Sequence, residues 1–180
     1  IFYGSNFENI LSSANLNEKG ATVFAYRVEN PEQFGVVHFD KDFNALSIEE
    51  KPKKPRSNYA VTGLYFFDNT ASEKVKKLKP SDRGELEISD LNNLYLNENN
   101  LKVEILGRGY AWLDTGTHSD LLEASHFIST LEKRQGFKIC CPEEIAFRKN
   151  WMSEKELRNL AEEIKHNSYG KYLLSIIDNK

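Results

Sequence analysis

A nearly continuous run of apolar residues from Tyr59 to Phe67 constrains the fold more than any other feature of the sequence. A strand with one face in water alternates between apolar and polar residues, so a run without alternation predicts a strand covered on both faces. Such a strand belongs in a sheet that has helices packed on both sides. Gly63 lies within the run, where a glycine either admits a ligand or a second backbone, or simply packs.

Other segments supply the layers that this strand needs. Helical spacing and capping patterns predict helices over 5–16, from Thr70 with Glu73 as a capping box, and over 88–95, 116–134, 153–164 and 171–177. Alternating and β-branched runs predict strands over 21–28, 34–39, 46–49, 101–106 and 110–113. We therefore predict an α/β domain, with a layered, mixed and mostly parallel sheet flanked by helices and a helical C-terminal tail.

Composition and charge narrow the classes of function. The 180 residues are 39% hydrophobic and 28% charged, and the net charge of -3 provides no field that attracts nucleic acid. No apolar stretch approaches the roughly 20 residues that cross a bilayer, and no secretory signal is visible. Cys140 and Cys141 are adjacent, a spacing that rarely allows a bridge, so two free thiols favour a cytoplasmic location. We expect neither a nucleic-acid nor a membrane partner.

Three charged stretches lie at the ends of predicted elements. Residues 49–52 close a strand, residues 81–87 lead into a helix, and Asp114 directly follows a strand. An acid at the carboxyl end of a strand lies where α/β sheets bind ligands. Each stretch also has an ordinary interpretation, as a surface ion pair, a solvated helix start or a helix N-cap. The basic run 51–56 is equally compatible with a solvated loop.

Taken in their order along the chain, five motifs resemble the sugar-phosphate half of the sugar-1-phosphate nucleotidylyltransferases, which have a Rossmann-like fold. The segment 134–146 is similar to the thymidylyl, dTDP-glucose-forming branch of that family, and the resemblance covers almost the whole chain. The motifs are Phe34-Gly35-Val36-Val37, Glu49-Glu50-Lys51-Pro52, Tyr59–Phe66, Arg83–Asp90 and Gly109–Thr117.

The start of the chain differs from that family. Ile1-Phe2-Tyr3-Gly4 has the pattern of a buried strand that runs into a turn. The glycine-rich triphosphate loop and the first metal-binding Asp of the family would precede Ile1. We therefore expect an incomplete domain that is inactive by itself.

The resemblance implies that glucose 1-phosphate and dTTP give dTDP-glucose and pyrophosphate with Mg²⁺ as cofactor, a first step toward dTDP-rhamnose and related deoxysugars. Of the implied catalytic residues, Lys51 would contact the sugar phosphate, Arg83 would add a planar second contact, and Asp114 would be a Mg²⁺ ligand. The implied substrate-binding residues are Gly35, Glu50, Lys51, Val61, Tyr65 (beside the phosphate), Arg83 and Trp112.

The resemblance also constrains the local backbone. Glu50 would accept hydrogen bonds from sugar hydroxyls, and the backbone of Gly35 and Val61 would touch the sugar. Glu50 and Lys51 are consecutive, so in a regular strand their side chains face opposite sides. Both line one pocket only if the strand distorts before Pro52, which restricts the residue that precedes it.

A second nucleotide site, used for feedback at a subunit interface in this family, is implied within a homotetramer. Ordinary surface charge is the alternative interpretation. We divide the chain into a sugar-phosphate-binding part, 1–134, and a C-terminal helical segment for oligomerisation and regulation, 135–180. The implied regulatory residues are Tyr3, Gly4, Arg108, Lys138, Glu144, Ile145 and Arg148.

Two alternatives stay open. The base of the nucleotide is not read by the residues present, so an enzyme of the same class making UDP-, ADP- or CDP-glucose is a rival interpretation. An isolated module that only binds sugar phosphate and assembles is the other. The four histidines match no metal spacing, and we interpret them as surface or helix residues: His38, His118, His126 and His166.

Overall fold

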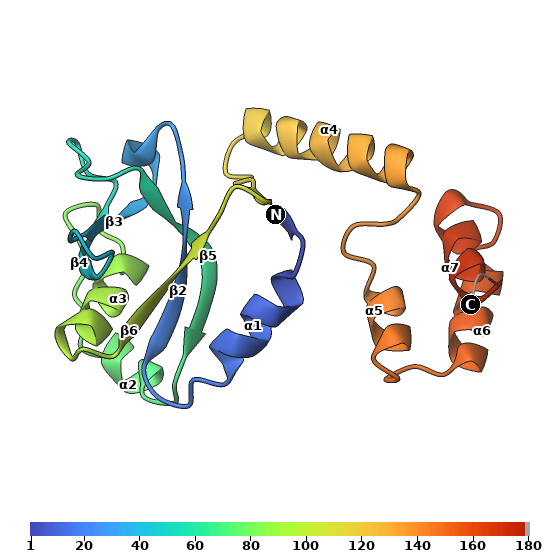
Figure 1. Cartoon of the computed structure of the whole chain (residues 1–180), viewed down its shortest axis with the longest axis horizontal. Coiled ribbons are helices and arrows are strands. Elements are labelled where there is room, and N and C mark those ends of the chain that lie inside the picture. Colours follow the sequence, from blue (N-terminus) through green and yellow to red (C-terminus); the bar gives the residue numbers. More distant parts are fainter. Residues whose placement is uncertain (179–180) are drawn as a thin grey trace. The chain divides into compact units, whose positions relative to one another are not determined.

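The computed structural model describes residues 1–178 and divides into two compact units (Figure 1). The first unit is Ile1–Leu113, and the second begins at Asp114. The boundary between the two compact units therefore lies before the long helix His118–Gln135. The boundary predicted between the sugar-phosphate-binding part and the C-terminal segment, at residue 134, lies near the end of this helix. That functional division stays a prediction. Among the described residues, no helix has the length and apolar character to cross a membrane.

A five-stranded sheet in the order β4-β3-β5-β2-β6 forms the centre of the first unit, and β1 and β7 make a separate antiparallel pair. The elements of this unit are β1 (Phe2–Gly4), α1 (Phe7–Asn15), β2 (Ala21–Arg27), the 3₁₀ helix η1 (Pro31–Gln33), β3 (Gly35–Phe39), β4 (Ala45–Glu50), β5 (Tyr59–Phe67), α2 (Ala71–Val75), α3 (Ile88–Asn97), β6 (Leu101–Leu106) and β7 (Tyr110–Trp112).

The strand pairing confirms a mixed sheet with flanking helices but corrects its predicted direction. The pairs β2–β5, β3–β4 and β3–β5 are antiparallel, and of the described pairs in this sheet only β2–β6 is parallel. The prediction of mostly parallel strands is therefore wrong. The connections give the reason, because β3 and β4 are joined by a short turn that forces an antiparallel hairpin, whereas β6 follows α2 and α3 and enters parallel to β2.

Helices cover both faces of the sheet. In β2, Phe24 packs in one buried cluster with Ala14 of α1. Ala21 lies on the opposite face of the same strand and packs with Leu91 and Tyr95 of α3. Figure 1 shows α1 on one side of the sheet and α3 on the other. The loops at the ends of the strands therefore extend from a sheet that is held between two helical layers.

The apolar run that forms β5 is covered unevenly along its length. Residues 60–62 are buried, whereas Gly63 is exposed and residues 64–67 are only partly buried. The predicted burial on both faces is thus confirmed for the first half of the strand only. The second half leaves side chains such as Tyr65 at a partly open surface.

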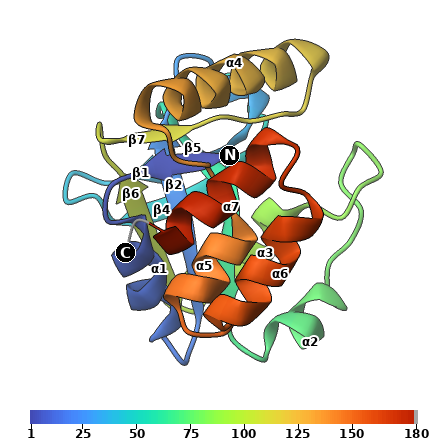
Figure 2. The same cartoon turned by 90° about the vertical axis from the view of Figure 1, so that its right-hand side faces the viewer.

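The second unit is helical, which confirms the predicted helical tail. Helices α5, α6 and α7 lie together in Figure 2 and share a buried apolar cluster that includes Leu157 and Leu173. Ser153 and Glu156 form a capping box at the start of the helix predicted over 153–164. The helices of the unit are α4 (His118–Gln135), α5 (Pro142–Arg148), α6 (Glu154–Glu163) and α7 (Ser168–Asp178).

Helix α7 begins three residues earlier than the sequence predicts, at Ser168. The side-chain oxygen of Asn167 accepts hydrogen bonds from the backbone N–H groups of Tyr169 and Gly170, both at 2.9 Å, and so satisfies the first turn. Cys140 is exposed and Cys141 is buried, and both are free thiols as predicted.

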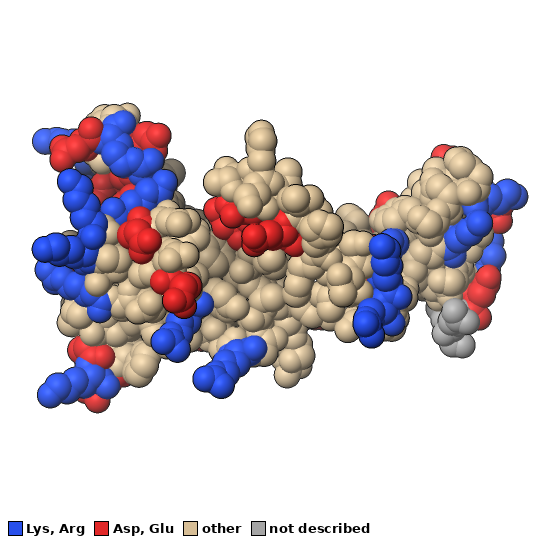
Figure 3. All heavy atoms as spheres, turned by 90° about the horizontal axis from the view of Figure 1, so that it is seen from above, with Lys and Arg blue, Asp and Glu red and all other residues tan. Residues whose placement is uncertain are grey.

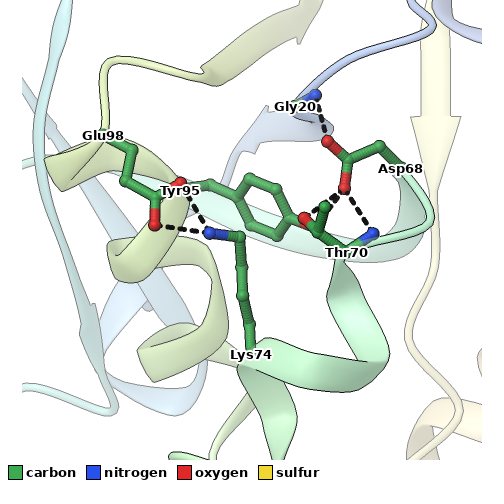
Figure 4. A network of polar contacts seen from close by, with 6 residues as sticks. All are labelled: Gly20, Asp68, Thr70, Lys74, Tyr95 and Glu98. Atoms are coloured by element: carbon green, nitrogen blue, oxygen red, sulfur yellow. Dashed lines mark hydrogen bonds and ion pairs between the residues drawn. The ribbon is translucent and has the colours of Figure 1, made fainter.

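Asp68 organises the loop between β5 and α2 (Figure 4). Its carboxylate accepts hydrogen bonds from the Gly20 N–H at 2.7 Å, the Thr70 N–H at 2.9 Å, the Thr70 hydroxyl at 2.6 Å and the Tyr95 hydroxyl at 2.8 Å. The predicted capping box of Thr70 and Glu73 is therefore wrong, because the Thr70 hydroxyl donates to Asp68 and makes no cap.

Lys74 is buried beside this network. Its Nζ lies 2.5 Å from both carboxylate oxygens of Glu98 and 4.7 Å from the centre of the Tyr95 ring. A buried ammonium group needs such partners, because an unpaired charge is costly away from water. The loop and the end of α3 are thereby held together on the side of the unit that Figure 4 shows.

We predict that Asp68→Asn lowers the free energy of unfolding by about 2 kcal/mol near neutral pH, because hydrogen bonds to a charged acceptor are lost. The donors around it, the Thr70 hydroxyl above all, hold the pKa of Asp68 well below its usual range. A depressed folded-state pKa contributes stability that is present above the unfolded pKa of about 4 and is lost as the pH falls toward the folded value.

Urea denaturation of the protein from about pH 7 to about pH 2 measures this contribution. The wild-type protein should lose stability with falling pH more steeply than the variant. Glu73→Gln is the control, because it removes only an exposed ion pair with Lys76 and should cost less than about 0.5 kcal/mol. Parallel pH profiles for wild type and Asp68→Asn would contradict the prediction.

Candidate functional site

The open end of the hairpin β3–β4 brings together the first group of predicted site residues. Gly35 and Glu50 are paired across the two strands, and Glu50 is the last residue of β4. The buried Ser89 hydroxyl at the start of α3 donates to Oε2 of Glu50 at 2.6 Å. A Cβ at position 35 would lie 3.0 Å from this hydroxyl and 3.1 Å from Oε2 of Glu50. Only a residue without a side chain leaves the carboxylate and its donor undisturbed.

Val61 and Tyr65 of β5 lie on the same side of the sheet as Glu50. The Cβ of Val61 lies 3.9 Å from the position that a Cβ would take at Gly35. Burial, together with the negative charge of Glu50, raises the pKa of Tyr65 to about 12. The phenol is protonated at physiological pH, as a tyrosine with an ordinary pKa also is, and has a hydrogen to donate.

Arg83 completes this cluster from the loop before α3. Its Nη1 lies 3.8 Å from Oε1 of Glu50 and 3.4 Å from Oε1 of the buried Glu87, and its Nη2 lies 3.2 Å from Oε2 of Glu85. The guanidinium thus lies beside the carboxylate predicted to bind sugar hydroxyls. The structure therefore brings Gly35, Glu50, Val61, Tyr65 and Arg83 together, as the sequence predicted.

Lys51 leaves the strand at the position where a distortion was the condition for Glu50 and Lys51 to line one pocket. It follows the end of β4 with a φ of 41°, a left-handed conformation that is uncommon for a residue other than glycine. Its backbone N–H still donates to the Phe34 carbonyl at 3.0 Å, so the break lies at Lys51 itself. The regular alternation that would send Glu50 and Lys51 to opposite faces ends here. The Lys51 side chain is exposed.

Charged side chains gather at the same end of the first unit. Figure 3 shows Lys and Arg interspersed with Asp and Glu over the region of β3 and β4. One pair in this region joins Arg56 to Glu49 at 3.8 Å, and the Arg56 side chain is largely exposed whereas that of Glu49 is partly buried. The basic run is therefore a solvated surface in part, which agrees with the ordinary interpretation of these residues, and Lys51 is set apart from it only by its backbone.

Trp112 lies on the same unit and packs through its ring. Its indole meets Phe34 edge-on at 5.2 Å and Tyr26 at 6.1 Å between ring centres. Phe34 directly precedes Gly35, so the contact ties β7 to the start of β3. The predicted substrate-binding residue Trp112 is thus held against the residue next to Gly35.

Asp114, the predicted Mg²⁺ ligand, is the first residue of the second unit and is described within that unit. It is exposed, and its Oδ2 lies 2.9 Å from the position that a Cβ would take at Gly116. Within residues 1–178, no three His, Cys, Asp or Glu side chains gather as a metal site. Mg²⁺ takes about six oxygen ligands, so the described residues do not form a complete site for it. The assignment of Asp114 to Mg²⁺ stays a prediction.

The predicted regulatory residues are divided between the two units. In the first unit, a Cβ at Gly4 would lie only 2.2 Å from the Tyr110 ring, so close packing against this ring requires a glycine here. In the second unit, Lys138 lies 2.5 Å from Glu132 and Arg148 lies 2.7 Å from Glu144. The regulatory role stays a prediction for the full set, which is Tyr3, Gly4, Arg108, Lys138, Glu144, Ile145 and Arg148.

Three residues of this site were missed as site residues by the sequence reasoning. Ser89 holds Glu50, and Ser81 and Glu87 hold Arg83, with the Ser81 hydroxyl donating to Glu87 at 2.7 Å. Their only signal was a position within or beside the motif 83–90. Polar residues before a helix are usual as caps, so the sequence alone does not distinguish the two roles.

Comparison with known proteins places this geometry in a family. Residues 1–130 match the family model described as Nucleotidyl transferase, and the chain belongs to that family. It is 56% identical over 177 residues to the glucose-1-phosphate thymidylyltransferase of Neisseria meningitidis serogroup A, covering 98% of this chain and 62% of the relative. It is 48% identical over 178 residues to the thymidylyltransferase of the same name from Mycobacterium tuberculosis, covering 99% and 62%. The chain thus spans 62% of the length of both relatives.

Solved structures agree with the fold. A crystal structure provisionally identified as a glucose-1-phosphate thymidylyltransferase from Bacillus anthracis, in complex with sucrose, has a TM-score of 0.60 and 40% identity, covering 71% of this chain and 50% of that one. A UDP-glucose pyrophosphorylase complexed with UDP-glucose has a TM-score of 0.59 at 19% identity, covering 72% and 52%. The second likeness concerns the fold alone.

We predict that Gly35→Ala destabilises the protein by about 1 kcal/mol or more, because the added methyl group meets the Ser89 hydroxyl and the Glu50 carboxylate. Gly63→Ala is the matched control in the neighbouring strand, since a Cβ there has no atom within 4 Å. It should be neutral or stabilise by about 0.5 kcal/mol. Urea denaturation of both variants checks the prediction, and equal effects at the two glycines would show that the contact is not tight.

Proposed function

We propose that the protein joins glucose 1-phosphate to dTTP, forming dTDP-glucose and releasing pyrophosphate. The observation that carries the proposal is the adjacency of Glu50 and Arg83, 3.8 Å apart at the open end of the hairpin. Similarity to glucose-1-phosphate thymidylyltransferases of two organisms supports the nucleotide. The chain spans 62% of the length of these relatives. The proposal therefore concerns the full-length protein.

The chemistry of a sugar phosphate fits this pair of side chains. Sugar hydroxyls donate hydrogen bonds, and the Glu50 carboxylate is an acceptor fixed by Ser89 at 2.6 Å. A phosphate presents pairs of oxygens that can accept two parallel hydrogen bonds from the planar guanidinium of Arg83. Lys51, next to Glu50 in sequence, adds a second cation whose flexible stem reaches an anion as a point charge.

In the proposed reaction, an oxygen of the sugar phosphate attacks the α-phosphorus of dTTP. A new P–O bond forms as the bond to pyrophosphate breaks, and pyrophosphate leaves with the electron pair. The nucleophile is already ionised near neutral pH, since the second pKa of a phosphate monoester is about 6, so no side chain has to remove a proton. The barrier lies in bringing two polyanions into line, and Arg83 and Lys51 lower it by neutralising and orienting the sugar phosphate.

The remaining assignments rest on the family resemblance. They are a Mg²⁺ ligand at Asp114, a homotetramer, a cytoplasmic location and a regulatory nucleotide site that includes Arg108 and Lys138. We propose them for the whole protein, with the rest of any Mg²⁺ shell supplied by substrate phosphates and water.

Turnover of full-length protein with dTTP, UTP, ATP and CTP tests the proposed function. Pyrophosphate release with glucose 1-phosphate should be fastest with dTTP. A preference for another nucleotide would change the product, and binding of glucose 1-phosphate without turnover by any nucleotide would favour a binding and assembly module.

We predict that Lys51→Ala in full-length protein lowers kcat/KM for glucose 1-phosphate by about 100-fold, a loss typical of a charged contact to a reacting phosphate. Lys53→Ala and Lys54→Ala are matched controls in the same exposed loop and should each change it by less than about threefold. Steady-state pyrophosphate release measures all three. Equal losses at the three positions would mean that the loop acts only as a diffuse positive field.

We predict that Asp114→Asn raises the Mg²⁺ concentration for half-maximal rate by about tenfold or more, because one anionic oxygen ligand is lost. Added Mg²⁺ should restore part of the rate, whereas alkaline pH should restore none, since no titrating base is removed. Rates measured against Mg²⁺ and against pH on one preparation separate the two roles. An unchanged Mg²⁺ requirement with a shifted pH profile would make Asp114 an acid or base.

A further inference from the structure

Arg83 lies among three carboxylates, which is unusual for a cation that has to receive a phosphate. Two of them, Glu85 and Glu87, lie 3.2 and 3.4 Å from its guanidinium nitrogens, and Glu50 lies at 3.8 Å. Each carboxylate competes with a phosphate for the same N–H groups unless it plays another part. Their burial separates them into two kinds.

Glu87 is the enclosed partner. Its side chain is only 10% exposed. Its Oε1 accepts hydrogen bonds from the Arg83 guanidinium at 3.4 Å and from the Ser81 hydroxyl at 2.7 Å. The Ser81 hydroxyl in turn accepts the backbone N–H of Arg83 at 3.2 Å. The three residues therefore form a closed ring of contacts that fixes Arg83 at its backbone and at its head.

The loop that carries this ring is itself ordered by its backbone. The Gly84 N–H donates to the Ser81 carbonyl at 2.8 Å, and the Ser81 N–H donates to the Glu85 carbonyl at 2.8 Å. Gly84 has a φ of 79°, which a glycine adopts without strain. The turn directs the Arg83 side chain back toward Glu87 and Glu50 at the start of α3.

Glu85 is the open partner. Its side chain is 64% exposed and holds the other end of the guanidinium, Nη2. An exposed pair of this kind contributes little and exchanges readily with solvent. A dianionic phosphate offers the same nitrogen atom a stronger acceptor.

We propose that Glu87 and Ser81 are positioning residues that hold Arg83 in place for the sugar phosphate, and that Glu85 is a competing carboxylate which the bound phosphate displaces. The inference rests on the proposed function, because it assigns these three residues to the same sugar-phosphate site. It gives the two glutamates opposite effects on one arginine.

Simple electrostatics leads to a different expectation. Removing either negative charge near a bound dianion should strengthen its binding, so Glu87→Gln and Glu85→Gln would both lower the KM for glucose 1-phosphate. Positioning reverses the sign at Glu87 alone, since an amide keeps the size of the side chain but no longer holds the guanidinium by charge.

Steady-state kinetics of full-length Glu87→Gln and Glu85→Gln test the inference. Glu87→Gln should raise the KM for glucose 1-phosphate by about tenfold, as expected for a lost hydrogen bond to a charged group, with the KM for dTTP unchanged. Glu85→Gln should lower the KM for glucose 1-phosphate by about two- to threefold. A lowered KM in both variants, or no change at Glu87→Gln, would overturn the proposal.

Ser81 supplies a second test that leaves the net charge unchanged. Ser81→Ala should raise the KM for glucose 1-phosphate in the same direction as Glu87→Gln, and Ser81→Thr, which keeps the hydroxyl, should restore it. Wild-type thermal stability in Ser81→Ala with a raised KM supports positioning, whereas an unchanged KM in Ser81→Ala overturns it. Should Glu87→Gln not fold, the Ser81 pair decides the matter.

Arg83→Ala separates the failure of this inference from failure of the proposed function. One outcome is that the wild-type protein is active, Arg83→Ala is inactive, and the KM for glucose 1-phosphate is unaltered in Glu87→Gln and Ser81→Ala. This outcome overturns the positioning roles and leaves the proposed function standing. Wild-type protein that neither binds nor turns over glucose 1-phosphate overturns both.

Discussion

Helix α3 is tied to the edge strand β4 at two points one helical turn apart, and the site depends on this attachment. Ser89 donates to Glu50, and the Asn93 side chain both accepts the Ile48 N–H at 3.0 Å and donates to the Ile48 carbonyl at 2.7 Å. An edge strand has unpaired backbone groups, and here a side chain satisfies them. The hairpin end cannot shift against α3 without breaking these bonds, so Glu50 is held where it meets Arg83.

The same attachment shapes the charge of the site. Glu50, Glu85 and Glu87 surround one arginine, so in the absence of a ligand its charge is largely compensated. A site of this kind does not attract anions by a strong field, in agreement with the net charge of -3. Under the proposed function, the site would select its anion by geometry, because the acceptor would have to replace an existing partner of the guanidinium and also present hydroxyl donors to Glu50.

Sequence reasoning named five residues that the structure brings together, but it missed the residues that hold them in place. Glu50 and Lys51 could line one pocket only if the strand distorted before Pro52, and the φ of 41° at Lys51 shows such a distortion. Sequence reasoning did not predict roles in the site for Ser81, Glu87 and Ser89, because polar residues at the start of a helix are commonly explained as caps. The error at Thr70 has the same origin, since its hydroxyl fits a capping box in sequence but is taken by Asp68 in space.

The sequence by itself determined the class of fold, the order of the motifs and most of the elements, though not η1 and α5, because apolar spacing and turn residues act over short distances. It determined the length of β5 to the residue. Only the tertiary structure decided which strands pair and in which direction, since β2 meets both β5 and β6 across long separations along the chain. Only the tertiary structure placed Ser89 under Glu50 and Glu87 beside Arg83, because hydrogen bonds of this kind depend on positions in space that local patterns do not encode.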